Sequence, residues 1–220
     1  MKASYKFCFG PWNIGEGADP YGPPVRKVRS FDWKLAQMRK LGFGAMMFHD
    51  DDAVPGVDGK PAAQVEKEAR ALKRKLDNAG VAAEMVAPRL WFSPKTIDGA
   101  YTSNDPKCRR YAIERSLRTI DIANALGTKL IVLWLAREGS YLRESKNSRQ
   151  CLEWLVEAAA SIATHLIDHG FTVALIDAHG TDPSEPPPTG ARAVLRHLAE
   201  VDRSDLDSLE QAVATAPSAA

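Results

Sequence analysis

The 220-residue sequence contains few cysteines, and none of its apolar stretches is long enough to cross a membrane. The three cysteines, Cys8, Cys108 and Cys151, are an odd number and form no CxxC pair. This argues against a disulfide framework and against a zinc site, so we expect reduced, partly buried thiols. The N-terminal residues MKASYKFCFG include no long apolar region and no cleavage-site pattern. The sequence therefore predicts a cytoplasmic protein with no membrane partner.

The sequence also lacks net charge. It has 29 basic and 28 acidic residues, which gives a formal net charge of +1. No overall field would attract nucleic acid or an anionic membrane. The glycines of GPWNIGEG have neither the GxGxxG spacing nor a P-loop lysine, so no nucleotide-binding loop is expected. We expect no nucleic-acid partner, and a neutral small molecule fits this composition best.

Apolar residues make up 45% of the chain and charged residues 26%, which is ordinary for a globular protein with a sizeable core. Five short apolar runs flanked by turn residues predict buried strands, at residues 5–9, 45–48, 83–86, 130–134 and 173–176. Four amphipathic stretches between them predict helices, at residues 31–41, 62–79, 105–126 and 148–169. A glycine follows each helix as a C-cap that turns the chain into the next strand, at Gly42, Gly80, Gly127 and Gly170.

Regular alternation of strands and helices predicts parallel strands joined by right-handed crossovers, hence an α/β sheet or a (β/α) barrel. The loops that follow the strands are long and rich in His, Asp, Trp, Arg and Glu, whereas those that precede them are short. Barrels and open parallel sheets both place their sites at the carboxyl ends of strands. We therefore expect function to concentrate there.

The sequence changes character near Gly180, where DPSEPPPTG begins. Proline removes a ladder donor and fixes φ, so this stretch is neither helix nor central strand. Residues 191–201 and 204–214 are compatible with amphipathic helices, and TAPSAA is typical of a disordered tail. We predict a division into residues 1–179, a partial barrel, and residues 180–220, a divergent segment.

The segment FHDDD, residues 48–52, places a histidine and three acids at a strand end. An acid that hydrogen-bonds one imidazole nitrogen fixes the tautomer and raises the basicity of the other nitrogen. His49 and Asp52 are thus candidates for a proton-transfer pair. The alternative is a solvated acidic turn that caps the next helix.

Tryptophan recurs at three other strand ends, as Trp12, Trp91 and Trp134. Aromatic faces around a polar centre suit a sugar, because its C–H faces stack while its hydroxyls need polar partners. Any one of these tryptophans could instead be an ordinary core or interface residue.

Taken together, these segments resemble the xylose isomerase family of TIM barrels. The matching pieces, in order, are FGPWNIGEGADPYG, FHDDDAVP, VAPRLWFSP, YTSNDPKCRRYAIERSLRTIDIANALG and VLWLAREG, and the resemblance covers residues 5–176. It implies a TIM barrel of about five βα units, which this chain alone would leave unclosed, with an open edge.

The resemblance also implies roles for single residues. His49 would open the cyclic sugar by proton transfer, and Asp52 would orient it. The three tryptophans would form an apolar, substrate-binding wall. Tyr21 stands where the family offers an aromatic ring to a neighbouring subunit, so a homo-oligomer is expected. Two divalent ions, Mg²⁺ or else Mn²⁺ or Co²⁺, would then assist a 1,2-hydride shift from aldose to ketose.

The chain departs from the family at the fifth strand. The family motif E-x-K-P-N-E-P aligns with IDAHGTDP, residues 176–183. Asp177 would be a metal ligand but is one methylene shorter than glutamate, and His179 would replace the sugar-binding lysine while being mostly uncharged at neutral pH. No counterparts of the remaining metal carboxylates follow. We expect an incomplete ligand set and a truncated chain, whose origin in a disrupted reading frame stays open.

Three functions remain in consideration. The first is an aldose–ketose isomerase of the type that converts D-xylose to D-xylulose. The second is a catalytically inactive remnant that at most binds sugar or an intact paralogue. The third is an epimerase or a three-metal endonuclease of the same superfamily, which the near-neutral charge disfavours for DNA.

Overall fold

The computed structural model describes residues 6–17, 23–135, 138, 147–171 and 173. The chain divides into two compact units. The first unit comprises Met1–Ile97 and Glu114–Arg137, and the second comprises Asp98–Ile113 and Glu138–Ala220. All the strands of the described part belong to the first unit.

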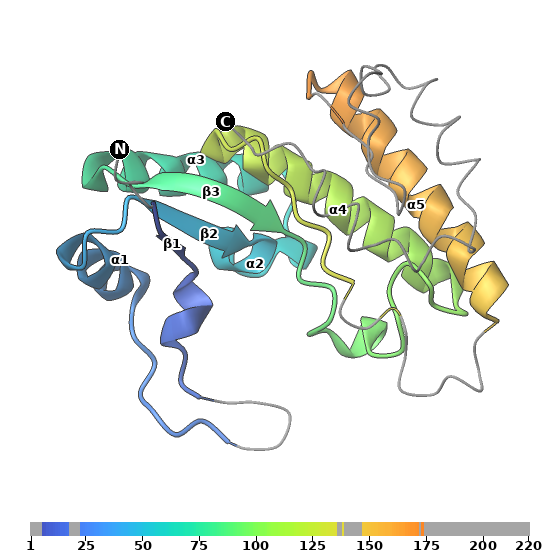
Figure 1. Ribbon diagram of the computed structural model, residues 1–220, viewed down its shortest axis with the longest axis horizontal. Coiled ribbons are helices and arrows are strands. Elements are labelled where there is room, and N and C mark those ends of the chain that lie inside the picture. Colours follow the sequence, from blue (N-terminus) through green and yellow to red (C-terminus); the bar gives the residue numbers. More distant parts are fainter. Residues whose placement is uncertain (1–5, 18–22, 136–137, 139–146, 172, 174–220) are drawn as a thin grey trace, which may run out of the picture. The chain divides into compact units, whose positions relative to one another are not determined.

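The first unit contains a parallel sheet in the order β1-β2-β3 (Figure 1). Its strands are β1 (Cys8–Phe9), β2 (Ala45–His49) and β3 (Ala82–Ala87). Both pairs of neighbouring strands are parallel, as the alternation of strands and helices predicts. Their carboxyl ends therefore lie at the same edge of the sheet.

The fourth predicted strand, at residues 130–134, is reduced to a single parallel bridge between Ile131 and Val86. The Val86 N–H donates to the Leu130 carbonyl at 3.1 Å, and the Val132 N–H donates to the Val86 carbonyl at 3.0 Å. Among the described residues, β3 is the one strand that pairs with this segment. The fifth predicted strand lies outside the described residues except for Val173.

The four predicted long helices are present with nearly the predicted bounds, as α1 (Phe31–Lys40), α3 (Ala62–Ala79), α4 (Pro106–Leu126) and α5 (Ser148–Asp168). Helix α4 begins one residue later than predicted because Asp105 caps it, its carboxylate accepting from the Lys107 N–H at 2.8 Å. The glycines that follow the helices have positive φ between 62° and 83°, as their C-cap role requires. They are Gly42, Gly80, Gly127 and Gly170.

Short helices occupy segments that the sequence suggested to be loops. They are η1 (Pro11–Ile14), α2 (Asp50–Ala53), η2 (Val57–Gly59) and η3 (Pro94–Thr96). The first turn of α2 consists of three aspartates, and negative charge there is favoured by the helix dipole. The acids thus form a helix turn, as the alternative for FHDDD proposed, but this turn is not solvated, because Asp50 is buried and Asp51 and Asp52 are half-buried.

The core of the first unit forms where β2 meets the helices. Met46 and Phe48 of β2 are fully buried and belong to one cluster with Val65 and Leu76 of α3. Side chains of α1 and of the second half of α4 complete this cluster. Strand β2 is therefore the most deeply packed strand, which fixes the position of the residues at its carboxyl end.

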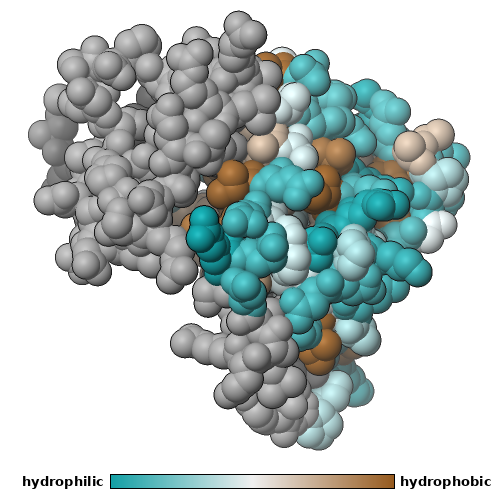
Figure 2. Space-filling model, turned by 90° about the vertical axis from the view of Figure 1, so that its right-hand side faces the viewer, coloured by the Kyte–Doolittle hydropathy of each residue, from teal (hydrophilic) through white to brown (hydrophobic). Residues whose placement is uncertain are grey.

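The coloured residues of Figure 2 are largely hydrophilic on the face shown, and the hydrophobic ones among them form small separate groups. None of the described helices is long and apolar enough to span a membrane. None of the three cysteines, all of them described, is in a disulfide, and Cys108 is buried while the other two are half-buried, in line with the predicted partly buried thiols.

Within the second unit, Glu138 binds the segment that precedes α4. Its carboxylate accepts hydrogen bonds from three successive backbone N–H groups, those of Ala100, Tyr101 and Thr102, at distances of 2.9 to 3.2 Å. The Thr102 hydroxyl donates both to this carboxylate and to the Glu138 carbonyl. A row of N–H groups of this kind makes an anion-binding concavity, which Glu138 fills from within the same chain.

Replacing Glu138 by Gln should therefore destabilise the protein by about 1.5–3 kcal/mol, the usual contribution of hydrogen bonds to a charged group. Urea unfolding measures the difference. The matched control is Glu66→Gln, which removes an exposed ion pair with Arg70 and should stay within about 0.5 kcal/mol of the wild type. Equal stabilities of the two variants would contradict the role given to Glu138.

Candidate functional site

Four aromatic rings meet at the carboxyl edge of the sheet. The His49 ring lies 4.1 Å from Trp12 and 5.1 Å from Trp91, measured between ring centroids, and Trp91 lies 6.0 Å from Trp134. Trp12 comes from η1 after β1, His49 ends β2, and Trp91 follows β3. The structure thus brings together four of the residues that the sequence singled out.

The close approach of Trp12 requires a glycine beside it. A Cβ atom at Gly10 would lie 2.3 Å from the indole ring, so any other residue there would displace Trp12. The Pro11 carbonyl accepts from the Lys34 ammonium of α1 at 2.8 Å, which ties η1 to α1. Trp12 and Trp91 are half-buried, whereas Trp134 is 59% exposed.

His49 and Asp52 form a close pair. His49 Nδ1 lies 2.8 Å from Asp52 Oδ2, and the same oxygen accepts from the His49 backbone N–H at 3.2 Å. The His49 residue is only 8% exposed. When Asp52 accepts a hydrogen bond from Nδ1–H, the other ring nitrogen, Nε2, is free to accept a proton.

Arg89, which follows β3, lies against this pair and was not predicted from the sequence. Its Nη2 atom is 2.7 Å from Asp52 Oδ2 and 2.6 Å from His49 Nδ1, and its Nε atom is 3.1 Å from Asp51 Oδ1. The guanidinium group therefore contacts all three polar side chains at the centre of the site.

Asp50 holds several segments of the site together, and this role was also not predicted from the sequence. Its carboxylate is fully buried and receives two bonds from Arg115 of α4, Nε to Oδ2 at 2.6 Å and Nη2 to Oδ1 at 2.9 Å. Oδ1 also accepts from the backbone N–H groups of Asp51 and Arg89, at 2.9 and 3.0 Å. One carboxylate thus ties the end of β2 to the segment after β3 and to α4.

The sequence does contain a signal for Arg115. It lies on the face of α4 that also carries the buried residues Ala112, Thr119, Ile122 and Ala123. An arginine at an inward position of an amphipathic helix needs a carboxylate partner, because an unpaired buried charge is very costly. Nothing in the sequence identifies which of the many acids that partner is.

The electrostatics of the neighbouring acids differ. Burial alone would raise the pKa of Asp52, but the hydrogen bond from His49 and the positive charge of Arg89 outweigh it and hold that pKa below its usual value. Burial raises the pKa of Asp51, and the charges of Asp50 and Asp52 add to this effect, while Arg89 opposes it. Asp52 therefore stays ionised beside His49.

A candidate metal-binding group of His49, Asp51 and Asp52 exists here, with ligand atoms within 4.8 Å of one another. All three side chains are already engaged by the Arg89 guanidinium, which carries a positive charge at the place a cation would need. The described residues of this site thus do not fit a divalent ion. Asp177, His179 and Tyr21 lie outside the described residues.

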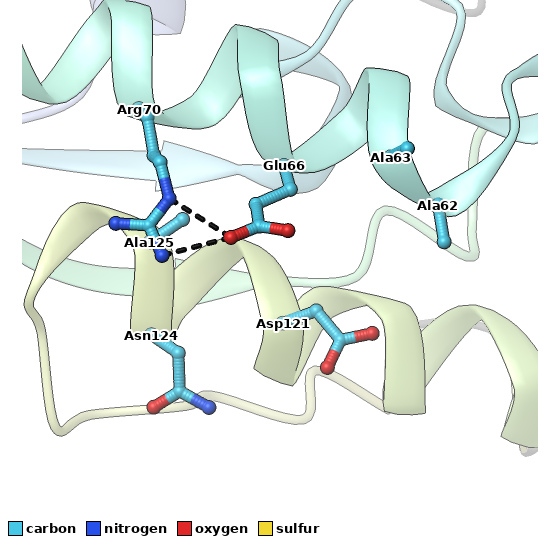
Figure 3. Close-up of a pocket in the computed structure, with 7 residues that line it drawn as sticks. All are labelled: Ala62, Ala63, Glu66, Arg70, Asp121, Asn124 and Ala125. Atoms are coloured by element: carbon cyan, nitrogen blue, oxygen red, sulfur yellow. Dashed lines mark hydrogen bonds and ion pairs between the residues drawn. The ribbon is translucent and has the colours of Figure 1, made fainter.

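A hollow of about 420 Å³ lies between α3 and α4, away from these rings (Figure 3). Glu66 and Arg70 face each other across an ion pair on its α3 side, as the dashed lines mark. Its lining residues are Ala62, Ala63, Glu66, Arg70, Asp121, Asn124 and Ala125. They include no histidine and no aromatic ring, so the strand-end cluster remains the candidate site.

Replacing Asp50 by Asn should destabilise the protein by about 3 kcal/mol, the low end for breaking a buried ion pair, because the buried Arg115 guanidinium then keeps only the more distant carboxylates of Asp51 and Asp58, at 3.6 and 3.5 Å. The exposed pair Lys73–Asp77 supplies the matched control, Asp77→Asn, for which a few tenths of a kcal/mol is expected. Urea unfolding curves provide both values. A loss for Asp50→Asn no larger than that of the control would refute the anchoring role.

The lowered pKa of Asp52 has a defined consequence for stability. The ionised carboxylate is favoured in the folded state, so its contribution is present above the ordinary value of 3.8 and is lost as the pH falls through the lower, folded value. The stability difference between wild type and Asp52→Asn, measured by unfolding at several pH values, should therefore shrink in acid. A stability difference between the two proteins that grows on acidification would contradict a lowered pKa of Asp52 in the folded state.

Comparison with known proteins extends this description. A family model described as xylose isomerase-like TIM barrel matches residues 35–207. Xylose isomerase from Thermus thermophilus is 33% identical over 171 residues, covering 77% of this chain and 44% of that protein, and the enzyme from Thermus caldophilus gives the same values. The chain thus spans less than half the length of these curated relatives.

Solved structures agree on the fold. A xylose isomerase domain protein from Planctomyces limnophilus aligns with a TM-score of 0.53 at 16% identity, covering 99% of this chain and 74% of that chain. A xylose isomerase-like TIM barrel protein from Mycobacterium smegmatis, solved with magnesium, has a TM-score of 0.50 at 17% identity, covering 89% and 62% respectively. The three parallel strands, with the bridge at Ile131, form an open part of such a barrel. The chain belongs to the xylose isomerase-like TIM barrel family.

Proposed function

We propose that His49 and Asp52 open the ring of a cyclic aldose, as the proton-transfer step of an aldose–ketose isomerase. The observation that carries this proposal is the 2.8 Å contact between His49 Nδ1 and Asp52 Oδ2, with the imidazole lying between Trp12 and Trp91. The superfamily includes isomerases, epimerases and AP endonucleases, and related sugar isomerases act on small sugars. A sugar substrate also suits the near-neutral net charge.

Ring opening requires one proton to move between two sugar oxygens. With Nδ1–H donating to Asp52, His49 Nε2 takes the proton of the anomeric hydroxyl and passes it to the ring oxygen. The bond from the anomeric carbon to the ring oxygen breaks while the carbonyl forms, so protons and charge balance. The tryptophan faces hold the C–H side of the sugar and exclude water from the imidazole.

The finer proposal is that the complete reaction converts D-xylose to D-xylulose in a homo-oligomer to which Tyr21 contributes. Proteins of this family generally bind divalent metals, which polarise the carbonyl and hydroxyl oxygens for a hydride shift. Asp177 is the one ligand proposed for such ions, and His179, two residues later in the sequence, is proposed to bind the sugar. Because the described site does not fit an ion, no step is assigned to a metal. We also propose that the partial barrel ends at residue 179 and the divergent segment begins at residue 180. A cytoplasmic location is proposed as well.

One observation favours a second candidate function. Arg89 pairs with Asp51 and Asp52 and leaves no acid of the described site free for a cation. A chain of this kind could bind and open a sugar without isomerising it, as an inactive remnant of an isomerase. Ketose formation distinguishes the two candidates.

The test uses D-xylose with Mg²⁺, Mn²⁺ or Co²⁺ and follows both anomer interconversion by polarimetry and ketose formation. His49→Gln should slow the protein-dependent part of anomer interconversion by about 10²–10⁴-fold, the usual contribution of a general acid–base group. The control variant is Asp77→Asn, far from the imidazole on the exposed face of α3.

Each outcome has a defined meaning. Ketose formation supports the isomerase, and it should be accompanied by a metal-dependent rise in melting temperature, because a ligand that binds only the folded state stabilises it. Anomer interconversion without ketose or any metal effect supports the remnant. Equal anomer interconversion by His49→Gln and wild type would refute the proposed role of His49 in either case.

A further inference from the structure

Three polar atoms form a nearly equilateral triangle at the centre of the site. His49 Nδ1, Asp52 Oδ2 and Arg89 Nη2 are separated by 2.8, 2.7 and 2.6 Å. Every side of this triangle is short enough for a strong hydrogen bond. Which of the three hydrogen bonds form at the same time depends on where the hydrogens are.

The chemistry of the three groups allows only two of the three bonds at once. An ionised carboxylate only accepts, a guanidinium only donates, and Nδ1 of a neutral imidazole either donates one hydrogen or accepts one. If Nδ1 donates to Asp52, its N–H points into the same small space as the Arg89 N–H. If Nδ1 accepts from Arg89, its lone pair faces the Asp52 oxygen. The Arg89–Asp52 bond persists in both arrangements.

We infer that Arg89 is a positioning residue that competes with Asp52 for Nδ1 and thereby controls which nitrogen of His49 carries the proton. When Asp52 binds Nδ1–H, Nε2 presents a lone pair. When Arg89 donates to Nδ1, Nε2 presents an N–H group. The link to catalysis rests on the proposed function, because ring opening uses Nε2 first as acceptor and then as donor.

Arg89 is held firmly enough for this role. Its Nε atom pairs with Asp51 at 3.1 Å, its backbone N–H donates to the buried Asp50 carboxylate at 3.0 Å, and its side chain is only 18% exposed. The other groups that face the imidazole are the rings of Trp12 and Trp91, which offer no in-plane partner for Nδ1. Asp52 and Arg89 are therefore the two described groups that decide the tautomer.

The experiment measures the tautomer directly, by long-range ¹H–¹⁵N correlation spectra of the full chain with ¹⁵N-labelled histidine, assigned with His49→Gln. In Arg89→Met the competing donor is gone, so the ratio of Nδ1–H to Nε2–H forms should rise by about tenfold or more, as loss of one hydrogen bond to a charged donor implies. Asp52→Asn should shift the ratio the other way. Unchanged His49 shifts in Arg89→Met would overturn the inference.

Two further variants guard against indirect effects. Arg70→Met removes an exposed arginine that pairs with Glu66 on α3, and it should leave the His49 spectrum unchanged. Arg89→Lys retains a charged donor, so it should retain more of the Nε2–H form than Arg89→Met does. This comparison between the two variants applies even if both are less stable than the wild type. A lysine variant with the same ratio as Arg89→Met would also count against competition for Nδ1.

These spectra separate this inference from the proposed function. A tautomer shift in Arg89→Met in a protein that opens no sugar ring would preserve the role of Arg89 and refute only its use in catalysis. An unchanged tautomer in a protein whose ring opening depends on His49 would do the reverse.

Discussion

The buried ion pair between Asp50 and Arg115 determines how the rest of this site is arranged. Removing a carboxylate and a guanidinium from water costs several kcal/mol, and only good geometry with further hydrogen bonds offsets that cost. Here the Asp50 carboxylate receives two bonds from Arg115 and two from backbone N–H groups. Because Asp50 directly follows His49, the same contacts that satisfy the buried charge also fix the backbone from which the imidazole projects.

A second consequence of this pair is the charge balance around His49. The described ion pairs join four carboxylates, those of Asp50, Asp51, Asp52 and Asp58, with the two guanidinium groups of Arg89 and Arg115. A guanidinium also differs from a metal ion, because its planar donors fix the directions of the carboxylates that it binds.

Much of this arrangement follows from the sequence, and the remainder does not for a physical reason. Apolar runs and C-cap glycines predict the strands and long helices, and parallel strands imply that His49 and the tryptophans at their ends converge. Asp50 and Arg115 are 65 residues apart in the chain, and His49 and Arg89 are 40 apart. Amphipathic periodicity shows that Arg115 points inward, but its choice among neighbouring acids depends on tertiary packing. Short segments such as α2 and residues 130–134 depend on the same packing.

The two halves of aldose–ketose isomerisation make different demands on a protein. Ring opening moves a proton between neutral oxygens and needs an imidazole whose Nε2 accepts a proton and then donates it. A hydride shift needs strong polarisation of two oxygens by hard cations. On the proposed function, His49 and Asp52 meet the first demand, while Arg89 engages Asp51 and Asp52, the acids nearest the imidazole that the second demand would use. A cation for the hydride shift would therefore have to be held by other residues, so that on the proposed function proton transfer and metal binding are spatially separate tasks in this chain.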